Sequence, residues 1–274
     1  MFRVLSDPLG QFGFILVLLL VASALLADQI SSFDPIKMAP RDRFQSPSLT
    51  HLLGTDQLGR DLFTRMIHGS RIALFVAAVS IGISLGIGIL FGLMAGYGPK
   101  WLDNALLLLF DAVRSFPTIM MALALATLVG PSLTTVILVV VLFSAPAYAR
   151  IIRTQTLSLR SAEFVLASVS IGASTPRILA VHVLPNIIGP ILILVSMDVP
   201  VVITTEAGMS FLGLGVRPPT PSWGSILNDG YAFVRESPWL AIAGGLPIIL
   251  ATLGFTFFGE ALRDAYDPKL RKLA

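Results

Sequence analysis

The chain contains no cysteine among its 274 residues, so it can form neither a disulfide framework nor a thiolate metal site. Its three histidines, His51, His68 and His182, are far apart in the sequence and predict no metal-ligand cluster. Charged residues are scarce at 13%, against about 25% in an ordinary globular domain. The net charge of +3 is spread among loops, which excludes the basic stripe typical of nucleic-acid-binding proteins.

The sequence also lacks the G-x-x-x-x-G-K-[ST] pattern of a phosphate-binding loop, so it predicts no nucleotide site in this chain. Apolar residues are abundant instead: 55% of the chain is hydrophobic and the mean hydropathy is +0.84. We therefore expect an integral membrane protein that binds no cofactor itself and is not an enzyme.

Six apolar segments predict an all-α protein of about six transmembrane helices, over residues 12–27, 72–97, 105–129, 133–149, 187–204 and 238–258. The first segment could instead be a cleaved signal peptide, with a small-residue site at Ala22-Ser23-Ala24 or within residues 24–27. We favour a retained helix, because an even number of spans returns the chain to its starting side.

Six spans place both termini on one side of the membrane, and a slight excess of Lys and Arg there favours cytoplasmic termini. The domain prediction follows from this topology. It consists of an N-terminal helix (1–27), a segment on the opposite side of the membrane (28–71), a core of five helices (72–262) with a cytoplasmic loop (150–186) and a loop on the opposite side (208–237), and a cytoplasmic tail (263–274).

Four charged residues fall within or at the end of apolar segments, where a charge is costly and therefore a functional candidate. Asp111 and Arg114 are one turn apart, and we expect them to neutralise each other near the interface. Asp198 is expected to interrupt the fifth helix together with Pro200, and Glu206 lies at the end of that helix. Asp198 could face a translocation path, pair with Arg114 or hold a bend.

The second apolar segment contains small residues on adjacent turns, namely Ser80, Gly82, Ser84, Gly86 and Gly88. In a bilayer, small residues let helix backbones approach closely, because lipid provides no hydrophobic drive for association. We expect this helix to pack in a bundle.

The loop over residues 150–186 predicts two short helices joined at Gly172. Ser161 is expected to cap the first, with Glu163 in its first turn, and Gly172 to stop it in a left-handed conformation. Ser174 or Thr175 is expected to cap the second, with Pro176 at its first position, before Pro185 marks the entry to the next apolar run.

One side of the first short helix is mostly apolar, because Phe164, Ala167, Ser168 and Ile171 recur at spacings of three and four residues. Such a face predicts a partner. The alternative is an ordinary amphipathic cytoplasmic loop.

Four stretches resemble known motifs of importers of the ATP-binding cassette (ABC) class. Leu166-Ala167-Ser168, Gly172 and His182-Val183-Leu184-Pro185 resemble the EAA loop of their permease subunits, with Leu166 where that family has glutamate. GTDQLGRD (54–61), SFLGLGVRPPTPSWG (210–224) and GEALRDAYDP (259–268) resemble the dipeptide, oligopeptide and nickel branch of the family.

This resemblance implies an importer-type ABC permease fold with a cytoplasmic coupling helix, in a multi-pass subunit of the inner (plasma) membrane. It also implies that residues 28–71 and 208–237 are periplasmic. It implies ATP-driven uptake of peptides, nickel complexes or related small solutes. The implied partners are a second, homologous permease, two ATPase subunits that bind ATP and Mg, a solute-binding protein and the lipid bilayer. The residues implied to couple to the ATPase are Glu163, Phe164, Ala167, Gly172, Leu184 and Pro185.

Two other classes are open to test. An ion-coupled secondary transporter would use intramembrane acids such as Asp111 and Asp198 directly, and would be expected to show inverted repeats, which we do not see. An intramembrane hydrolase would need a nucleophile and a base at helix depth, but Ser144 and Ser196 have no histidine in any predicted span.

Overall fold

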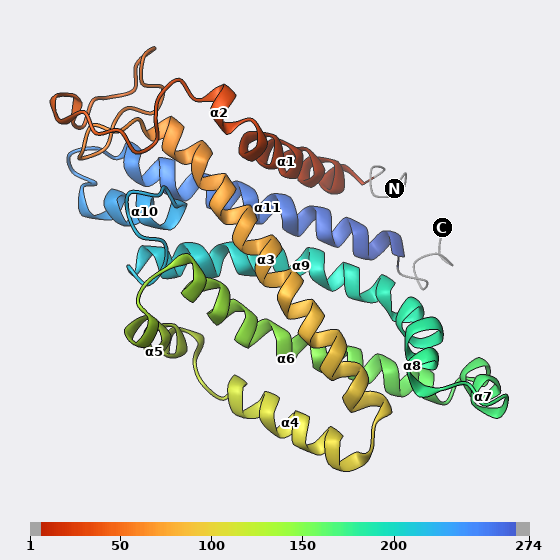
Figure 1. Ribbon diagram of the computed structural model, residues 1–274. Helices are drawn as coiled ribbons and strands as arrows, with labels where there is room; N and C mark the ends of the chain where they lie inside the picture. The colour runs from red at the N-terminus through yellow and green to blue at the C-terminus, as the bar shows by residue number, and fades with distance from the viewer. Residues whose placement is uncertain (1–6, 267–274) are drawn as a thin grey trace. The chain divides into compact units, whose positions relative to one another are not determined.

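The computed structural model describes residues 7–266, and within them the chain is helical, with loops and no strand (Figure 1). Five helices are long and apolar enough to cross a membrane, and a broken pair of helices raises the number to six. The long ones are α1 (Pro8–Leu25), α3 (Leu62–Tyr97), α6 (Leu133–Arg160), α9 (Leu184–Phe211) and α11 (Trp239–Tyr266). The predicted all-α membrane fold is confirmed. The predictions on residues 267–274 lie outside the described residues.

The third predicted helix is wrong as a single element, because it is divided into α4 (Lys100–Arg114) and α5 (Thr118–Val129). The break falls at residues 115–117. Pro117 explains it: proline has no N–H for the helical ladder, and it disfavours helical geometry at the residue before it.

Several boundaries also differ from the predictions. Helix α3 begins ten residues earlier than predicted, at Leu62, and α6 continues to Arg160, so the loop after it is shorter. Helix α9 runs through Asp198 and Pro200, so the predicted interruption there is wrong. Long polar side chains such as Arg160 are good helix formers, and the sequence gives no stop signal before them.

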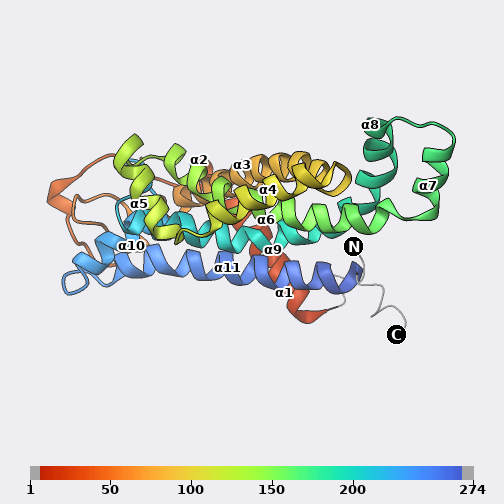
Figure 2. The same ribbon diagram turned by 90° about the horizontal axis from the view of Figure 1, so that it is seen from below.

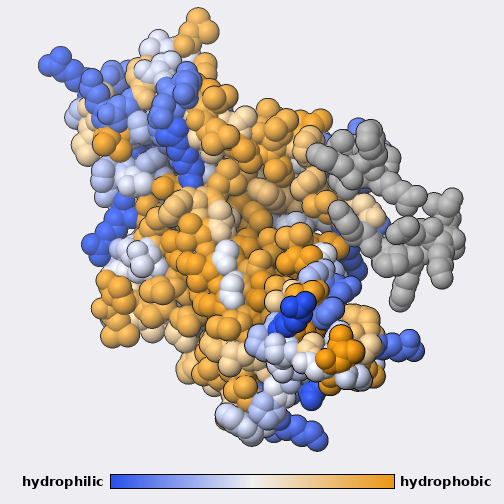
Figure 3. Space-filling view, turned by 45° about the vertical axis from the view of Figure 1, so that its right-hand side comes forward, coloured by the Kyte–Doolittle hydropathy of each residue, from blue (hydrophilic) through white to orange (hydrophobic). Residues whose placement is uncertain are grey.

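The helices form two compact units, which we describe separately. The first comprises residues 1–79, 122–137 and 196–274, and the second comprises residues 80–121 and 138–195. Helices α3, α6 and α9 each contribute to both. Hydrophobic side chains cover much of the face shown in Figure 3, as expected for helices that meet lipid.

In the first unit, α1 packs along α11 (Figures 1 and 2). The two backbones approach closely at a pair of glycines. A Cβ atom on Gly13 would lie 2.6 Å from the backbone nitrogen of Phe258, and one on Gly254 would lie 2.8 Å from Cβ of Leu16. Only glycine permits this approach.

The GTDQLGRD stretch of the first unit forms a buried network of charges. Asp56 accepts hydrogen bonds from the backbone and from Nε of Arg60, the latter at 2.6 Å, and Asp61 accepts from Nδ1 of His51 at 2.8 Å. Arg60 also reaches the carboxylate of Asp229, at 4.0 Å, and burial raises the pKa of that carboxyl group. The network links this stretch to α10 (Trp223–Ala232).

Helix α10 lies within the predicted loop over residues 208–237 and is anchored by a buried acid of α9. Ser222 caps it in a capping box with Ser225. The carboxylate of Glu206, which is 1% exposed, accepts hydrogen bonds from the hydroxyls of Ser210 and Ser222, both at 2.8 Å. Glu206 therefore joins the end of α9 to the start of α10.

In the second unit, α3 packs on α6 through glycines spaced four residues apart. A Cβ atom on Gly88 would lie 2.5 Å from Tyr148 Cβ, and one on Gly92 would lie 2.7 Å from the carbonyl oxygen of Ala149. Gly96 meets Thr156 in the same way. The predicted close packing of this helix is confirmed, but of the predicted small residues Gly82 and Gly86 would meet nothing within 4 Å in the described chain. They lie on a different side of α3.

Candidate functional site

The candidate site is the loop between α6 and α9, all of it in the second unit (Figure 1). It contains α7 (Glu163–Ser170), a short α8 (Thr175–Arg177) and a π-helical stretch, η3 (Ile178–Val183). The prediction of two short helices is confirmed for the first. The second is continuous with α9, which the sequence did not indicate.

Helix α7 begins differently from the prediction. Its N-cap is Ala162, which has no side-chain hydrogen bond to offer, and the hydroxyl of Ser161 instead donates to the carbonyl oxygen of Ser158. The end of α6 extends to Arg160, so the chain leaves only two residues between the helices. Glu163 lies in the first turn and is exposed, where the helix dipole favours an anion.

Gly172 ends α7 as predicted, with φ of +81°. Its N–H donates to the carbonyl oxygen of Val169 at 2.9 Å, and the N–H of Ala173 donates to that of Ser168 at 3.0 Å. These bonds satisfy carbonyl groups that the helix end would otherwise leave free. A Cβ atom on Gly172 would meet nothing within 4 Å, so the backbone conformation alone favours glycine here.

After the turn, Ser174 is the N-cap without a side-chain hydrogen bond, and Pro176 is the second helical residue rather than the first. The helix then continues unbroken over residues 175–211. Pro185 lies in the first turn of α9, as predicted, although η3 joins α9 without a break. Pro185 has no N–H for the ladder, and the π-helical stretch that precedes it is where the ladder changes its spacing.

The surface of α7 divides into a buried and an exposed part. Val165 and Ser168 are buried, and α7 packs against η3. Ser168 therefore lies on the inner side, in contrast to the predicted outer face. The apolar side chains left exposed are Phe164 (43%), Leu166, Val169 and Ile171 (86%). We call these four residues the α7 patch.

The α7 patch has the chemistry of a docking surface. Phe164 and Ile171 lie seven residues apart, on one side of this helix, and Leu166 and Val169 lie on another side. Exposed apolar side chains on a helix outside the candidate spans make α7 the candidate docking helix. The helix is short, and its end is set by Gly172 and its inner side by η3, so it presents the patch in one orientation. Of the other predicted coupling residues, Ala167 and Pro185 are exposed and Leu184 is partly buried.

The predicted ion pair between Asp111 and Arg114 is wrong. Asp111 pairs with Arg150 of α6, while Arg114 is exposed in the last turn of α4. A second bridge joins Arg153 to Asp103, with one contact of 2.6 Å. Both bridges tie α4 to the end of α6 that leads into the loop. Sequence reasoning missed them because the partners are 39 and 50 residues apart.

The remaining predicted site residues lie in α9, outside the loop. Asp198 is partly buried, and its role stays a prediction. Glu206 serves to pair elements, as described above. Among residues 7–266, no group of three His, Asp or Glu side chains is arranged to hold a metal ion.

Comparison with known proteins identifies relatives along the whole chain. Residues 88–272 match the family described as the binding-protein-dependent transport system inner membrane component. The chain is 36% identical over 266 residues to the dipeptide transport system permease protein DppC of Alkalihalophilus pseudofirmus, covering 97% of this chain and 88% of that protein. It is 38% identical over 270 residues to the glutathione transport system permease protein GsiD of Pectobacterium atrosepticum, covering 98% and 90%.

A third relative is the oligopeptide transport system permease protein OppC of Bacillus subtilis, 36% identical over 272 residues, covering 99% of this chain and 89% of that protein. Among solved structures, a chain of the MetNI methionine ABC transporter in an inward-facing conformation matches with a TM-score of 0.60 at 18% identity. This match covers 74% of this chain and 97% of that one. It supports the fold alone, which is the expected importer-type permease fold. These comparisons do not favour the ion-coupled alternative.

Proposed function

Because the chain belongs to the family of binding-protein-dependent transport system inner membrane components, we propose that separate ATPase subunits drive it by docking on the α7 patch. The chain is a permease subunit of an ABC importer in the membrane. The ATPase subunits bind ATP and Mg, and this chain supplies the conduit and the docking helix.

The observation that carries this proposal is the exposure of Phe164 and Ile171 on a helix that lies outside the candidate spans. Large apolar side chains at the centre of a protein interface supply most of its binding energy. Glu163, Ala167 and Gly172 complete the docking helix, and Leu184 and Pro185 connect it to α9. A displacement of α7 is passed to α9 because their connection is continuous helix from Thr175.

The orientation follows from the same assignment. The α7 patch faces the cytoplasm, where ATP is available, and both termini lie on that side. Residues 28–61 and α10 then face the outside, where a solute-binding protein delivers cargo. A second, homologous permease completes the translocation path, and two ATPase subunits serve the pair. Asp198 and Arg114 are candidates for that path.

The cargo class is proposed from the relatives. The proteins named above belong to systems for dipeptides, oligopeptides and glutathione, so short peptides are the proposed substrates. Nickel complexes stay a prediction from the sequence motifs.

Replacing Gly172 with valine tests the proposal. A β-branched residue at φ +81° costs about 1–2 kcal/mol or more, so the turn opens and α7 leaves its orientation. We expect ATP-driven peptide uptake and substrate-stimulated ATP hydrolysis to fall roughly tenfold in vesicles that contain the full transporter, since 1.4 kcal/mol corresponds to a factor of ten.

Gly172→Asn is the matched control, because asparagine tolerates the left-handed conformation and the site has room for its side chain. It should retain most of the uptake. Equal amounts of all three proteins in the membrane would show that insertion is unaffected. Normal uptake by Gly172→Val would contradict the proposed coupling role.

A further inference from the structure

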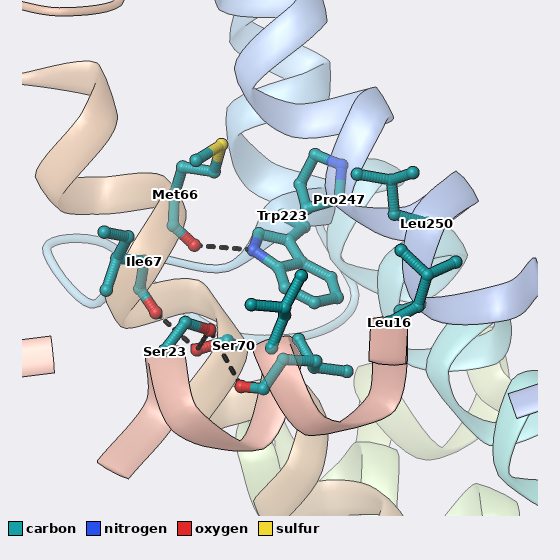
Figure 4. A pocket seen from close by; sticks show the side chains of 11 residues that line it. Leu16, Ser23, Met66, Ile67, Ser70, Trp223, Pro247 and Leu250 are labelled. Carbon is teal, nitrogen blue, oxygen red and sulfur yellow. Dashed lines mark hydrogen bonds between the residues drawn. The ribbon is translucent and has the colours of Figure 1, made fainter. Parts of the chain in front are cut away.

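The first unit contains a cavity of about 240 Å³ between α1, α3 and α11, closed at its base by the start of α10 (Figure 4). Trp223 forms that base and is 1% exposed. Its indole N–H donates to the carbonyl oxygen of Met66 at 2.8 Å. A Cβ atom on Gly69 would lie 2.5 Å from the same ring, so Trp223 is held closely against α3.

The cavity exists because α1 and α11 touch at one level and separate beyond it. Gly13 and Gly254 bring the two backbones into contact, as described above. Further along, Leu16 and Leu20 of α1 face Pro247 and Ala251 of α11 across the cavity. Pro247 lies inside α11 and removes a ladder hydrogen bond there, which permits the helix to bend.

The lining is mostly apolar, and its few hydrogen-bond donors already donate to backbone carbonyl oxygens. The hydroxyl of Ser23 donates to the carbonyl oxygen of Leu20, and that of Ser70 donates to the carbonyl oxygen of Ile67 at 2.5 Å. With the indole N–H bonded to Met66 as well, the cavity offers a polar ligand no free donor. Apolar cavities of about 150 Å³ stay dry in proteins and bind hydrocarbons.

The cavity opens toward lipid. Leu19 and Leu250 line it and are 59% and 39% exposed, and all three helices are candidate membrane spans. At 1.5 Å per residue, Ser23 and Leu16 lie about 3 and 14 Å from the end of α1 at Leu25. The cavity therefore lies within one leaflet of a hydrocarbon layer about 30 Å thick, on the side of residues 28–61.

We propose that this cavity binds one acyl chain of a membrane phospholipid from that leaflet, and that the chain fills the space between α1 and the other helices. Acyl chains are the hydrocarbon present at high concentration at its opening. Binding is favoured by dispersion contacts between the acyl chain and the cavity wall, since the atoms that line an empty cavity lack such contacts. The hydrophobic effect contributes little, because the chain moves from one apolar medium to another.

The test is photo-crosslinking of the assembled transporter in vesicles that contain a phospholipid with a diazirine in the middle of one acyl chain. Adducts are mapped by mass spectrometry on Trp223, Ile67 and Ala251, which are buried from bulk lipid, and on Leu18, which is exposed to it. We expect adducts on the buried residues as well as on Leu18. Adducts on Leu18 alone would overturn the proposal, because the cavity would then be empty or filled by another subunit.

Filling the cavity should expel the chain. Ala251→Leu adds bulk to the lining and should lower the ratio of Trp223 to Leu18 adducts roughly tenfold. Leu20→Phe and Leu18→Phe are a matched pair on the same helix, and of these two residues only Leu20 lines the cavity. Leu20→Phe should lower the yield on Trp223 while Leu18→Phe leaves it unchanged, and this pair gives the answer if Ala251→Leu fails to insert.

The same crosslinking experiment is repeated with a free fatty acid that carries a diazirine, in place of the phospholipid probe. If it labels Trp223 and the phospholipid probe does not, the occupant is a free fatty acid and the proposal for phospholipid is wrong. An unchanged yield in both filling variants would also contradict it. None of these outcomes depends on the docking of the ATPase at the α7 patch.

Discussion

Replacing Ile171 with aspartate is expected to abolish ATP-driven uptake while the chain still inserts in the membrane. Ile171 is 86% exposed in the α7 patch, so the substitution disturbs no internal packing. In the docked state the new carboxylate would be buried in an apolar contact without a partner, which is costly. Loss of an interface anchor costs about 2 kcal/mol or more, equivalent to roughly 30-fold weaker binding.

The measurement is co-purification of the ATPase subunits with the tagged permease, followed by peptide uptake in vesicles. Ser170→Asp is the matched control, because it places the same charge on the neighbouring exposed residue of α7, outside the apolar patch. It should retain both subunits and most of the uptake. If Ile171→Asp bound the ATPase normally, the α7 patch would not be the docking surface.

Replacing Gly92 with leucine is expected to prevent stable folding of the second unit. A Cβ atom there would already lie 2.7 Å from the carbonyl oxygen of Ala149 and from Cβ of Ile152, both on α6. Overpacking by small additions costs about 1–3 kcal/mol, and a leucine against backbone atoms exceeds that range. Since total stabilities are about 5–15 kcal/mol, the loss is a large part of the whole.

The expected result is a large fall in the yield of monodisperse protein and in its unfolding temperature in detergent. Gly86→Leu is the control on the same helix, because its side chain would meet nothing within 4 Å in the described chain. It should change the unfolding temperature of the isolated chain very little. Equal losses in both variants would show that the cause is helix propensity or lipid exposure, not contact with α6.

Helix–helix contacts could be predicted from the sequence only in part. Small residues close together in the sequence predicted close packing of α3. However, a helix contacts its partner through residues about four apart, because these lie on the same face. Gly88, Gly92 and Gly96 satisfy that spacing and contact α6, whereas Gly82 and Gly86 do not. The four-residue spacing of Gly88, Gly92 and Gly96, and not the number of glycines in the segment, indicates which face of α3 packs against another helix. Nothing local shows that α6 is the helix opposite.

Local conformation was predictable where one residue decides it. Gly172 takes the left-handed conformation that a helix stop requires. Pro117 breaks the third predicted helix, although the apolar pattern continues across it. The cap of α7 was not predictable, because α6 extends to Arg160. Ser161 follows it directly, and its hydroxyl donates to the carbonyl oxygen of Ser158 instead of capping α7. Asp111 pairs with Arg150 and not with Arg114, because α4 packs along α6. This tertiary contact joins residues too far apart in the sequence to be predicted from it.

The site was predictable as a loop with an apolar face, and the resemblance to known permeases supplied the proposed function of that loop. The continuity of that loop with α9 was not predictable, because Pro185 reads as a boundary in the sequence. In the proposed coupling, this continuity lets a force on α7 reach a membrane helix. The α7 patch and the unbroken helix after it together form the mechanical link in the account.

Uptake measured with and without the ATPase subunits tests the central claim most directly. Vesicles contain this chain, its second permease and the loaded solute-binding protein, with either ATP and the ATPase subunits or an imposed proton or sodium gradient. The account predicts accumulation of peptide only with the ATPase subunits and ATP. Accumulation driven by the ion gradient in their absence would contradict it.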